Sequence, residues 1–162
     1  RELIAEDRPL TLTVPNMTRF LMTLDESVDL VLHAMLHAEG GEIFVRKASA
    51  CTVQHLAEAM RLKYSPRGED HPISVIGIRP GEKIDEILVN EYEMQRVTEE
   101  EDYFRIHPEY RLPPHLTPRT LGEEYTSANT RQLTTPEEIS SLLDAMDEVR
   151  EVRPAAAGYQ PG

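Results

Sequence analysis

The sequence predicts an α/β chain, mixed α+β as it stands, and three observations support this prediction. Short strand-like stretches alternate with amphipathic helical patterns along most of the 162 residues. Helix start and stop signals flank those patterns. Apolar residues make up 40% of the chain, which is enough for a buried core. The length suits one compact domain or one lobe of a larger protein.

The first half of the chain reads as strand, helix, strand, helix. Residues 10–14, within PLTLTV, alternate apolar and polar side chains, as a short strand does. Thr23 and Glu26 can form a capping box at the start of a helix that Gly40-Gly41 ends. The apolar face of this helix consists of Val28, Val31, Leu32 and Met35. A short strand follows at 42–45, and a second helix begins after Thr52.

The second half is less regular. Residues 73–78 (ISVIGI) predict a buried strand, and the following RPGEK opens a short helix, IDEILV. Residues 103–106 predict one more strand, whereas the proline-rich stretch after it is mostly irregular. The sequence Thr135-Pro136-Glu137-Glu138 starts a last helix. Residues 151–162 read as a disordered tail.

Charge and cysteine content exclude several classes of protein. The net charge of −12 disfavours broad nucleic-acid binding, although two or three arginines can still form a local phosphate site. No apolar run approaches the roughly 18–20 residues that span a bilayer. The single Cys51 excludes a disulfide framework and a thiolate zinc cage, so we interpret it as a packing residue. An intracellular, cytoplasmic origin fits these features.

The sequence offers one metal-like spacing of histidines and no arrangement of residues that is typical of a catalytic centre. His33 and His37 stand four residues apart on the first predicted helix, a spacing that can hold a metal, and Asp29 extends the stripe. A solvated polar face is the preferred interpretation, because the stripe lies mainly off the apolar face. The eight glycines form no dinucleotide-binding fingerprint, and no tyrosine is followed four positions later by lysine. These residue patterns therefore indicate no cofactor-binding or metal-binding residue, and the family resemblance described below implies that this chain contributes no catalytic residue.

GIRPGEK is the most suggestive local motif. It delivers Arg79 to a proline-glycine turn, and Glu82 follows three residues later. Arginine offers a planar fork for a diphosphate, and a carboxylate can accept hydrogen bonds from sugar hydroxyls. Arg19, just beyond a predicted strand in NMTRF, is a candidate second phosphate contact. The alternative is a surface turn with an internal Arg-Glu pair.

Four stretches, taken in order, resemble a known family: NMTRFLMTLDESVDLVLHA, GGEIFVRK, LAEAM and GIRPGEKIDEILV. They are similar to the carboxy-terminal half of the CapD-like and CapE-like polysaccharide biosynthesis proteins. That family contains UDP-N-acetylglucosamine 4,6-dehydratases and related 5-epimerases of the extended short-chain dehydrogenase/reductase superfamily. The stretches at 87–110 and 124–143 resemble the extra carboxy-terminal segment of the CapE-like subgroup.

The resemblance implies a substrate-binding lobe at 1–90, a CapE-like carboxy-terminal segment at 91–150, and an NAD(P)-binding Rossmann lobe that this chain lacks. The implied UDP-contacting residues are Arg19, Arg79 and Glu82, with Met17 and Thr18 as neighbours. Arg46 stands where the family usually has proline, and it either adds a phosphate contact or alters the exit of the strand. NADP or NAD would serve the intact enzyme, with none held by this chain.

The implied activity is a 4,6-dehydration of a UDP-N-acetylhexosamine, with or without inversion at C5, in capsular or surface polysaccharide synthesis. A 4-epimerase within the same family stays open, and so does a non-catalytic module for nucleotide-sugar binding or oligomerisation. The chain starts without methionine and directly in a helix-like ELIAED, which predicts a fragment. Without a Rossmann lobe, the first helix and the GGEIFV strand would expose apolar surface, so we expect self-association into a homo-oligomer.

Overall fold

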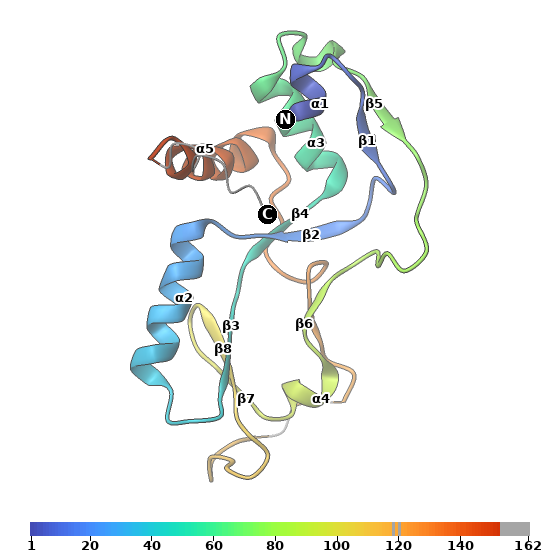
Figure 1. Cartoon of the computed structure of the whole chain (residues 1–162). Helices are drawn as coiled ribbons and strands as arrows, with labels where there is room; N and C mark the ends of the chain where they lie inside the picture. Colours follow the sequence, from blue (N-terminus) through green and yellow to red (C-terminus); the bar gives the residue numbers. More distant parts are fainter. Residues whose placement is uncertain (118, 120, 153–162) are drawn as a thin grey trace, which may run out of the picture.

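A computed structural model describes residues 1–117, 119 and 121–152 of the chain (Figure 1). Helices and short strands alternate along the sequence, which confirms the mixed α/β character predicted above. In chain order the elements are α1 Glu2–Ala5, β1 Leu10–Leu12, β2 Thr18–Leu21, α2 Leu24–His37, β3 Ile43–Arg46, β4 Ser49–Thr52, α3 Val53–Tyr64, the 3₁₀ helix η1 Gly68–Asp70, β5 Ile73–Val75, β6 Ile87–Val89, α4 Glu91–Met94, β7 Val97–Glu99, β8 Tyr103–Ile106, β9 Tyr125–Thr126 and α5 Pro136–Val152.

The strands form four small sheets, of which two close the first half of the chain on itself and two tie the two halves together. Strand β1 pairs in parallel with β5, and β2 pairs with β4 in antiparallel register. Strand β3 lies at the edge of a three-stranded antiparallel sheet of order β3-β8-β7. Strand β6 pairs with β9, and an isolated parallel bridge joins Ala50 to Gln132. Residues after 90 therefore complete sheets that begin before it.

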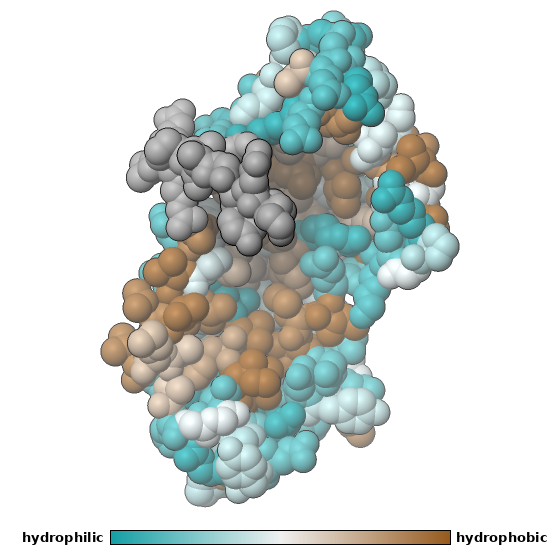
Figure 2. Space-filling view, in the orientation of Figure 1, coloured by the Kyte–Doolittle hydropathy of each residue, from teal (hydrophilic) through white to brown (hydrophobic). Residues whose placement is uncertain are grey.

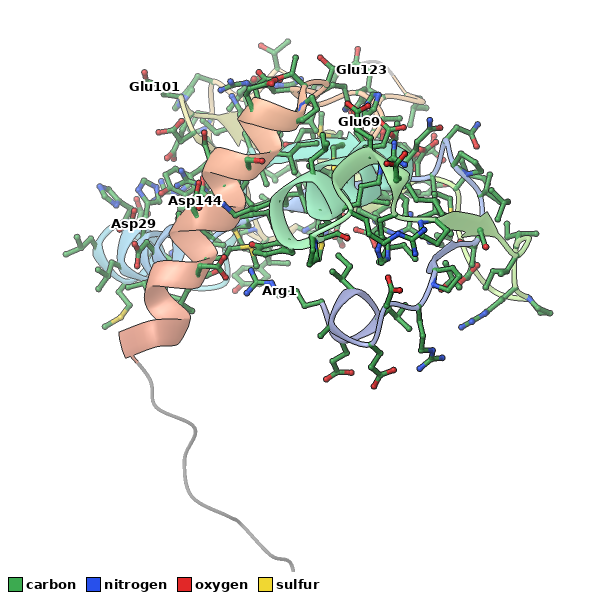
Figure 3. All side chains as sticks on the ribbon, turned by 90° about the horizontal axis from the view of Figure 1, so that it is seen from above. Arg1, Asp29, Glu69, Glu101, Glu123 and Asp144 are labelled. Carbon is green, nitrogen blue, oxygen red and sulfur yellow. The ribbon has the colours of Figure 1, made fainter. Side chains whose placement is uncertain are left out.

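Two apolar clusters form the core, and both draw on the two halves of the chain. One contains Val89, Met94, Val97, Phe104, Ile106 and Tyr125, with Phe20 and Val45 packed against it. The other lies between α3 and α5 and contains Cys51, Ala59, Leu133, Ile139 and Leu143. Seen from above in Figure 3, α5 lies alongside α3. The predicted segments 1–90 and 91–150 thus share one core.

The predicted helix starts are confirmed at three places. The Thr23 hydroxyl accepts from the Glu26 amide at 3.2 Å while the Glu26 carboxylate accepts from the Thr23 amide at 2.8 Å, which is the capping box. The Thr52 hydroxyl accepts from the His55 amide at the start of α3. Helix α5 begins at Pro136, directly after Thr135.

Two predictions about residues 73–89 are wrong. IDEILV does not form a helix: residues 87–89 are strand β6, because Tyr125–Thr126 supplies a partner strand that local sequence cannot reveal. The stretch 73–78 is a strand only at Ile73–Val75 and is not buried, since Val75, Ile76 and Ile78 are 60%, 50% and 52% exposed. The predicted tail lies outside the described residues, apart from residues 151 and 152 at the end of α5.

Helix α2 leaves an apolar face in contact with solvent. None of its 14 residues is buried. Figure 2 shows brown, apolar side chains gathered over this helix and the strands beside it. The half-exposed or exposed apolar side chains of α2 are Leu24, Val28, Val31, Leu32, Met35 and Leu36. This is the exposed surface that the sequence predicts for α2.

The excess of negative charge is spread over the molecule. Figure 3 labels acidic side chains on α2, η1, the β7–β8 turn, the segment before β9 and α5. No helix in the described part of the chain combines the length and the apolar character needed to cross a membrane.

Candidate functional site

The turn at 79–82 is exposed and closed by its own residues. The Glu82 carboxylate accepts a hydrogen bond from the Arg79 amide at 3.0 Å, and the Glu82 amide donates to the Arg79 carbonyl at 3.1 Å. Gly81 has φ +87°, a conformation that favours glycine. The Arg79 guanidinium makes no hydrogen bond or ion pair with any described residue. The turn thus uses one oxygen of Glu82 for its own geometry and leaves the arginine fork facing solvent.

Arg19 reaches the same loop from strand β2. Its guanidinium donates to the carbonyls of Lys83 at 3.1 Å and Ile84 at 3.2 Å, and to its neighbour Thr18 at 2.6 Å. Its Nε lies 3.4 Å from a carboxylate oxygen of Glu86. The structure therefore brings the two sequence motifs together: Arg19 holds the chain directly after the Arg79–Glu82 turn.

Met17 and Thr18 lie beneath this loop, at the start of β2. Met17 is 1% exposed, and its sulfur accepts from the Thr13 hydroxyl at 3.1 Å. Thr18 is 8% exposed, and its hydroxyl donates to the Asp85 carboxylate at 2.6 Å. Both side chains support the loop from the core side.

Sequence reasoning missed Ser127, which completes this arrangement from the carboxy-terminal part of the chain. Ser127 is fully buried, its hydroxyl lies 2.6 Å from that of Thr18, and it accepts from the Glu86 amide at 2.8 Å. Its own amide donates to the Glu86 carbonyl at 2.8 Å. A single serine in a loop has no periodicity or motif that could have revealed this role.

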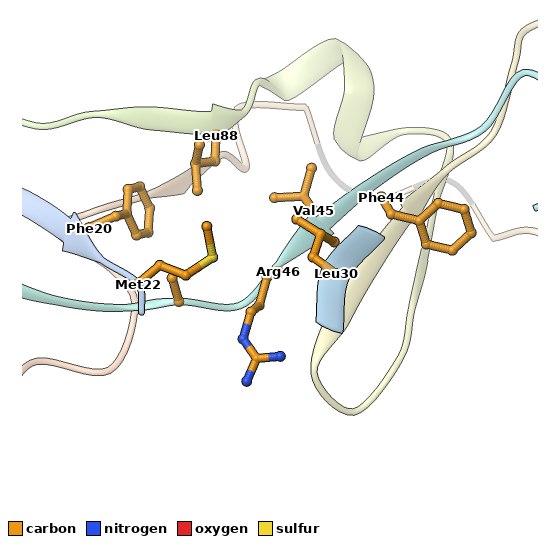
Figure 4. Close-up of a pocket in the computed structure, with 8 residues that line it drawn as sticks. Phe20, Met22, Leu30, Phe44, Val45, Arg46 and Leu88 are labelled. Atoms are coloured by element: carbon orange, nitrogen blue, oxygen red, sulfur yellow. The ribbon is translucent and has the colours of Figure 1, made fainter. Parts of the chain in front are cut away.

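An apolar groove of about 430 Å³ lies between α2 and the strands next to it (Figure 4). Arg46 is its one charged lining residue, and it donates to the Tyr103 hydroxyl at 3.1 Å and to the Glu26 carboxylate at 3.3 Å. The Arg46 side chain is therefore held by internal partners. The remaining lining residues are Phe20, Met22, Leu30, Phe44, Val45, Ala48 and Leu88.

The two histidines of α2 belong to an aromatic stack. The His33 ring lies 4.0 Å from the Tyr103 ring and 4.2 Å from the His37 ring, between centroids. Its Nε2 lies 2.9 Å from the Glu100 carboxylate. His33 is thus packed against β8 instead of forming a solvated face, and within the described ranges no group of three or more His, Cys, Asp or Glu residues is placed to hold a metal ion.

A second, polar hollow of about 370 Å³ is formed largely by the segment after β8. Its charges are mostly paired: Arg111 donates to Glu42 at 2.8 Å and to the Gly40 carbonyl at 2.9 Å. Burial lowers the pKa of His107, which lies in the same wall and contacts the Thr98 hydroxyl at 2.8 Å. This hollow presents no unpaired positive fork comparable to that of Arg79.

Comparison with known proteins gives the family. Residues 1–108 match the model of a family described as "Polysaccharide biosynthesis protein". The chain belongs to this family. The match supports the predicted placement in the extended short-chain dehydrogenase/reductase superfamily.

Two curated relatives and one solved structure extend the comparison. The chain is 41% identical over 155 residues to a "UDP-glucose 4-epimerase" of Rickettsia rickettsii (strain Sheila Smith), which covers 91% of this chain and 44% of the relative. It is 39% identical to the protein of the same name from Rickettsia felis (strain ATCC VR-1525 / URRWXCal2), with the same coverage. The solved structure is "X-ray structure of Pen from Bacillus thuringiensis", with a TM-score of 0.70 and 30% identity, covering 89% of this chain and 43% of that one. The chain spans less than half the length of these relatives.

Proposed function

We propose that this chain is the UDP-sugar-binding portion of a nucleotide-sugar dehydratase or epimerase that acts in polysaccharide biosynthesis. The observation that carries the proposal is the solvent-facing Arg79 fork on a turn that Arg19 braces from β2. Membership of a polysaccharide biosynthesis family supports the same class of substrate.

The proposed contacts follow from the chemistry of these side chains. Arg79 would bind the diphosphate through charge-assisted hydrogen bonds, which are stronger than hydrogen bonds between neutral groups. Glu82 keeps one carboxylate oxygen for the turn, so its second oxygen would accept from sugar or ribose hydroxyls. Arg19 would hold the turn in place through the Lys83 and Ile84 carbonyls, with Met17 and Thr18 as its supporting neighbours.

The residues of this chain do not fit a dinucleotide, because its glycines form no phosphate-binding fingerprint. We propose that NAD or NADP is bound by another part of the intact enzyme. The apolar face of α2 and the groove beside it would pack against that part, since six apolar side chains of α2 are about half exposed or more and lie next to an apolar groove. Relatives more than twice as long as the chain support this assembly.

Two activities are compatible with such a portion. The CapE-like sequence features favour a UDP-N-acetylglucosamine 4,6-dehydratase or 5-epimerase, and the names of the Rickettsia relatives favour a UDP-glucose 4-epimerase. Either reaction requires the reacting carbon of the sugar to be held in a fixed orientation. Orientation and binding energy are what this chain would supply.

Calorimetric titration of the 162-residue chain with UDP, UDP-N-acetylglucosamine and UDP-glucose tests the proposal. Loss of the charge-assisted contacts in Arg79→Ala should weaken binding by roughly 10- to 100-fold. Arg8→Ala is the matched control, because Arg8 is exposed and pairs only with the nearby Glu6. A preference for one of the two nucleotide sugars would separate the two activities.

Binding that Arg79→Ala abolishes and Arg8→Ala leaves unchanged would support the UDP site. If the folded chain gives no binding heat with any of the three ligands, the titration is repeated on the full-length enzyme. If the full-length enzyme binds UDP equally well with and without Arg79→Ala, the proposed site is wrong.

A further inference from the structure

Ser127 has the hydrogen-bond pattern of a residue that locks two distant segments together. The single proton of the Thr18 hydroxyl goes to the Asp85 carboxylate at 2.6 Å, so in the 2.6 Å contact between the two hydroxyls Ser127 is the donor. A lone pair of the Ser127 oxygen then accepts from the Glu86 amide at 2.8 Å. The 3.2 Å contact with the Thr18 carbonyl competes for the same Ser127 proton and is the weaker of the two.

The segment that Ser127 holds is the one that leaves the Arg79–Glu82 turn. The Ser127 amide and hydroxyl bond to both backbone groups of Glu86, while the Ile84 carbonyl accepts from the Thr18 amide at 3.0 Å. On the other side of the turn, the Ile76 amide donates to the Leu12 carbonyl at 2.7 Å. The exposed turn is thus anchored at both ends, and one anchor comes from beyond residue 120.

We propose that Ser127, in the carboxy-terminal segment, is a positioning residue for the Arg79–Glu82 turn. The inference rests on the proposed function in one respect, that the turn is positioned for a UDP ligand. Ser127 makes no contact with the turn itself and would act through Glu86 and Thr18. By this assignment the segment after residue 90 contributes to substrate binding without touching the substrate.

Hydrogen–deuterium exchange of the full 162-residue chain, with and without Ser127→Ala, tests the positioning role directly. Removing the hydroxyl leaves the Glu86 amide without its acceptor, so exchange of the Glu86 amide should accelerate roughly 5- to 100-fold. Ser141→Ala is the matched control, because that hydroxyl is exposed and donates only to the Glu137 carbonyl within α5. Exchange in α3 should stay unchanged in both variants.

A second variant covers the case in which Ser127→Ala does not fold. Thr18→Val removes the partner hydroxyl of Ser127 with nearly the same shape, so it should loosen Ser127 and accelerate exchange of the same Glu86 amide. Unchanged exchange of the Glu86 amide in a folded variant overturns the proposal. A uniform rise across the whole chain also overturns it, because Ser127 would then serve only general stability.

UDP titration separates this proposal from the proposed function. If wild-type chain or enzyme binds UDP, Ser127→Ala should weaken UDP binding at least several-fold while Ser141→Ala does not. If UDP binds neither the wild-type chain nor the wild-type full-length enzyme, the proposed function fails. The exchange data alone then decide whether Ser127 holds the turn. UDP affinity that stays unchanged despite faster exchange of the Glu86 amide overturns the link between the anchor and the ligand.

Discussion

The double substitution Met35→Lys and Leu36→Gln tests whether α2 forms an association surface. These side chains are 75% and 79% exposed in the isolated chain, so replacing them removes no internal packing of consequence. Lysine and glutamine are good helix formers, and a positive charge near the carboxy-terminal end of a helix is favourable. The variant should therefore fold as well as the wild type.

The expected effect follows from the apolar area that association would cover. Full burial of one such side chain contributes about 1.5–3 kcal/mol, so three-quarters of that area corresponds to about 1–2 kcal/mol each. The pair then contributes about 2–4 kcal/mol, which is roughly a 30- to 1,000-fold change in the association constant. Packing imperfections and the cost of association lower the net value toward the bottom of that range.

Sedimentation velocity over a wide range of concentrations measures this effect. The wild-type chain should self-associate as its concentration rises, and the double variant should stay monomeric at concentrations where the wild type does not. Asp25→Asn is the control, because it changes an exposed polar residue of the same helix. A wild-type chain that is monomeric throughout, with a sharp melt independent of concentration, would refute the reasoning.

Three further predictions concern the core and its titrating groups. Burial raises the pKa of the Cys51 thiol to about 11, so a thiol reagent near neutral pH should modify Cys51 only on unfolding; rapid modification of the native chain would contradict the packing at β4. Ile139→Ala should lower the free energy of unfolding by about 2–5 kcal/mol in a urea titration, because Ile139 is fully buried between α3 and α5, whereas the exposed Leu121→Ala should change it little. Separate transitions for the two halves of the chain would contradict the shared core. Burial and the hydrogen bond to Asp147 raise the pKa of Tyr64 to about 12 from its ordinary value of 10. Because the folded state holds this proton more tightly, the stabilisation is complete below pH 10 and is lost as the pH rises toward 12. The stability difference between wild type and Tyr64→Phe should therefore shrink over that interval, and a constant difference would contradict it.

The features best predicted from the sequence rest on contacts between near neighbours. The starts of α2 and α3 were predicted correctly because Thr23 meets Glu26 and Thr52 meets His55 within a single turn of helix. Strand β6 was mispredicted because its strand character depends on Tyr125–Thr126, far along the chain. Exposure was the hardest property to predict: residues 75–78 are apolar enough for a core, and nothing local indicates that this chain leaves them uncovered.

In the candidate site, too, the features set by near neighbours were predicted and those set by distant segments were not. The GIRPGEK motif predicted the turn and its two charged residues, since a proline-glycine turn is specified by its own sequence. That Arg19 meets this loop could be expected only from the family resemblance. Ser127 and Asp85 were not predicted, because a buried hydroxyl network between distant segments has neither spacing nor period to reveal it.

The distance of 109 residues between Thr18 and Ser127 also sets an order of events during synthesis. Chains emerge from the ribosome amino end first, at about 5–20 residues per second, so Thr18 and the Arg79–Glu82 turn leave the tunnel seconds before their buried partner does. During that interval the Glu86 amide can bond only to water, and strand β6 lacks its neighbour β9. A nascent chain interrupted before residue 127 would hold the charged turn only through Leu12, Thr18 and Arg19, and the proposed binding surface would mature only after Ser127 has emerged.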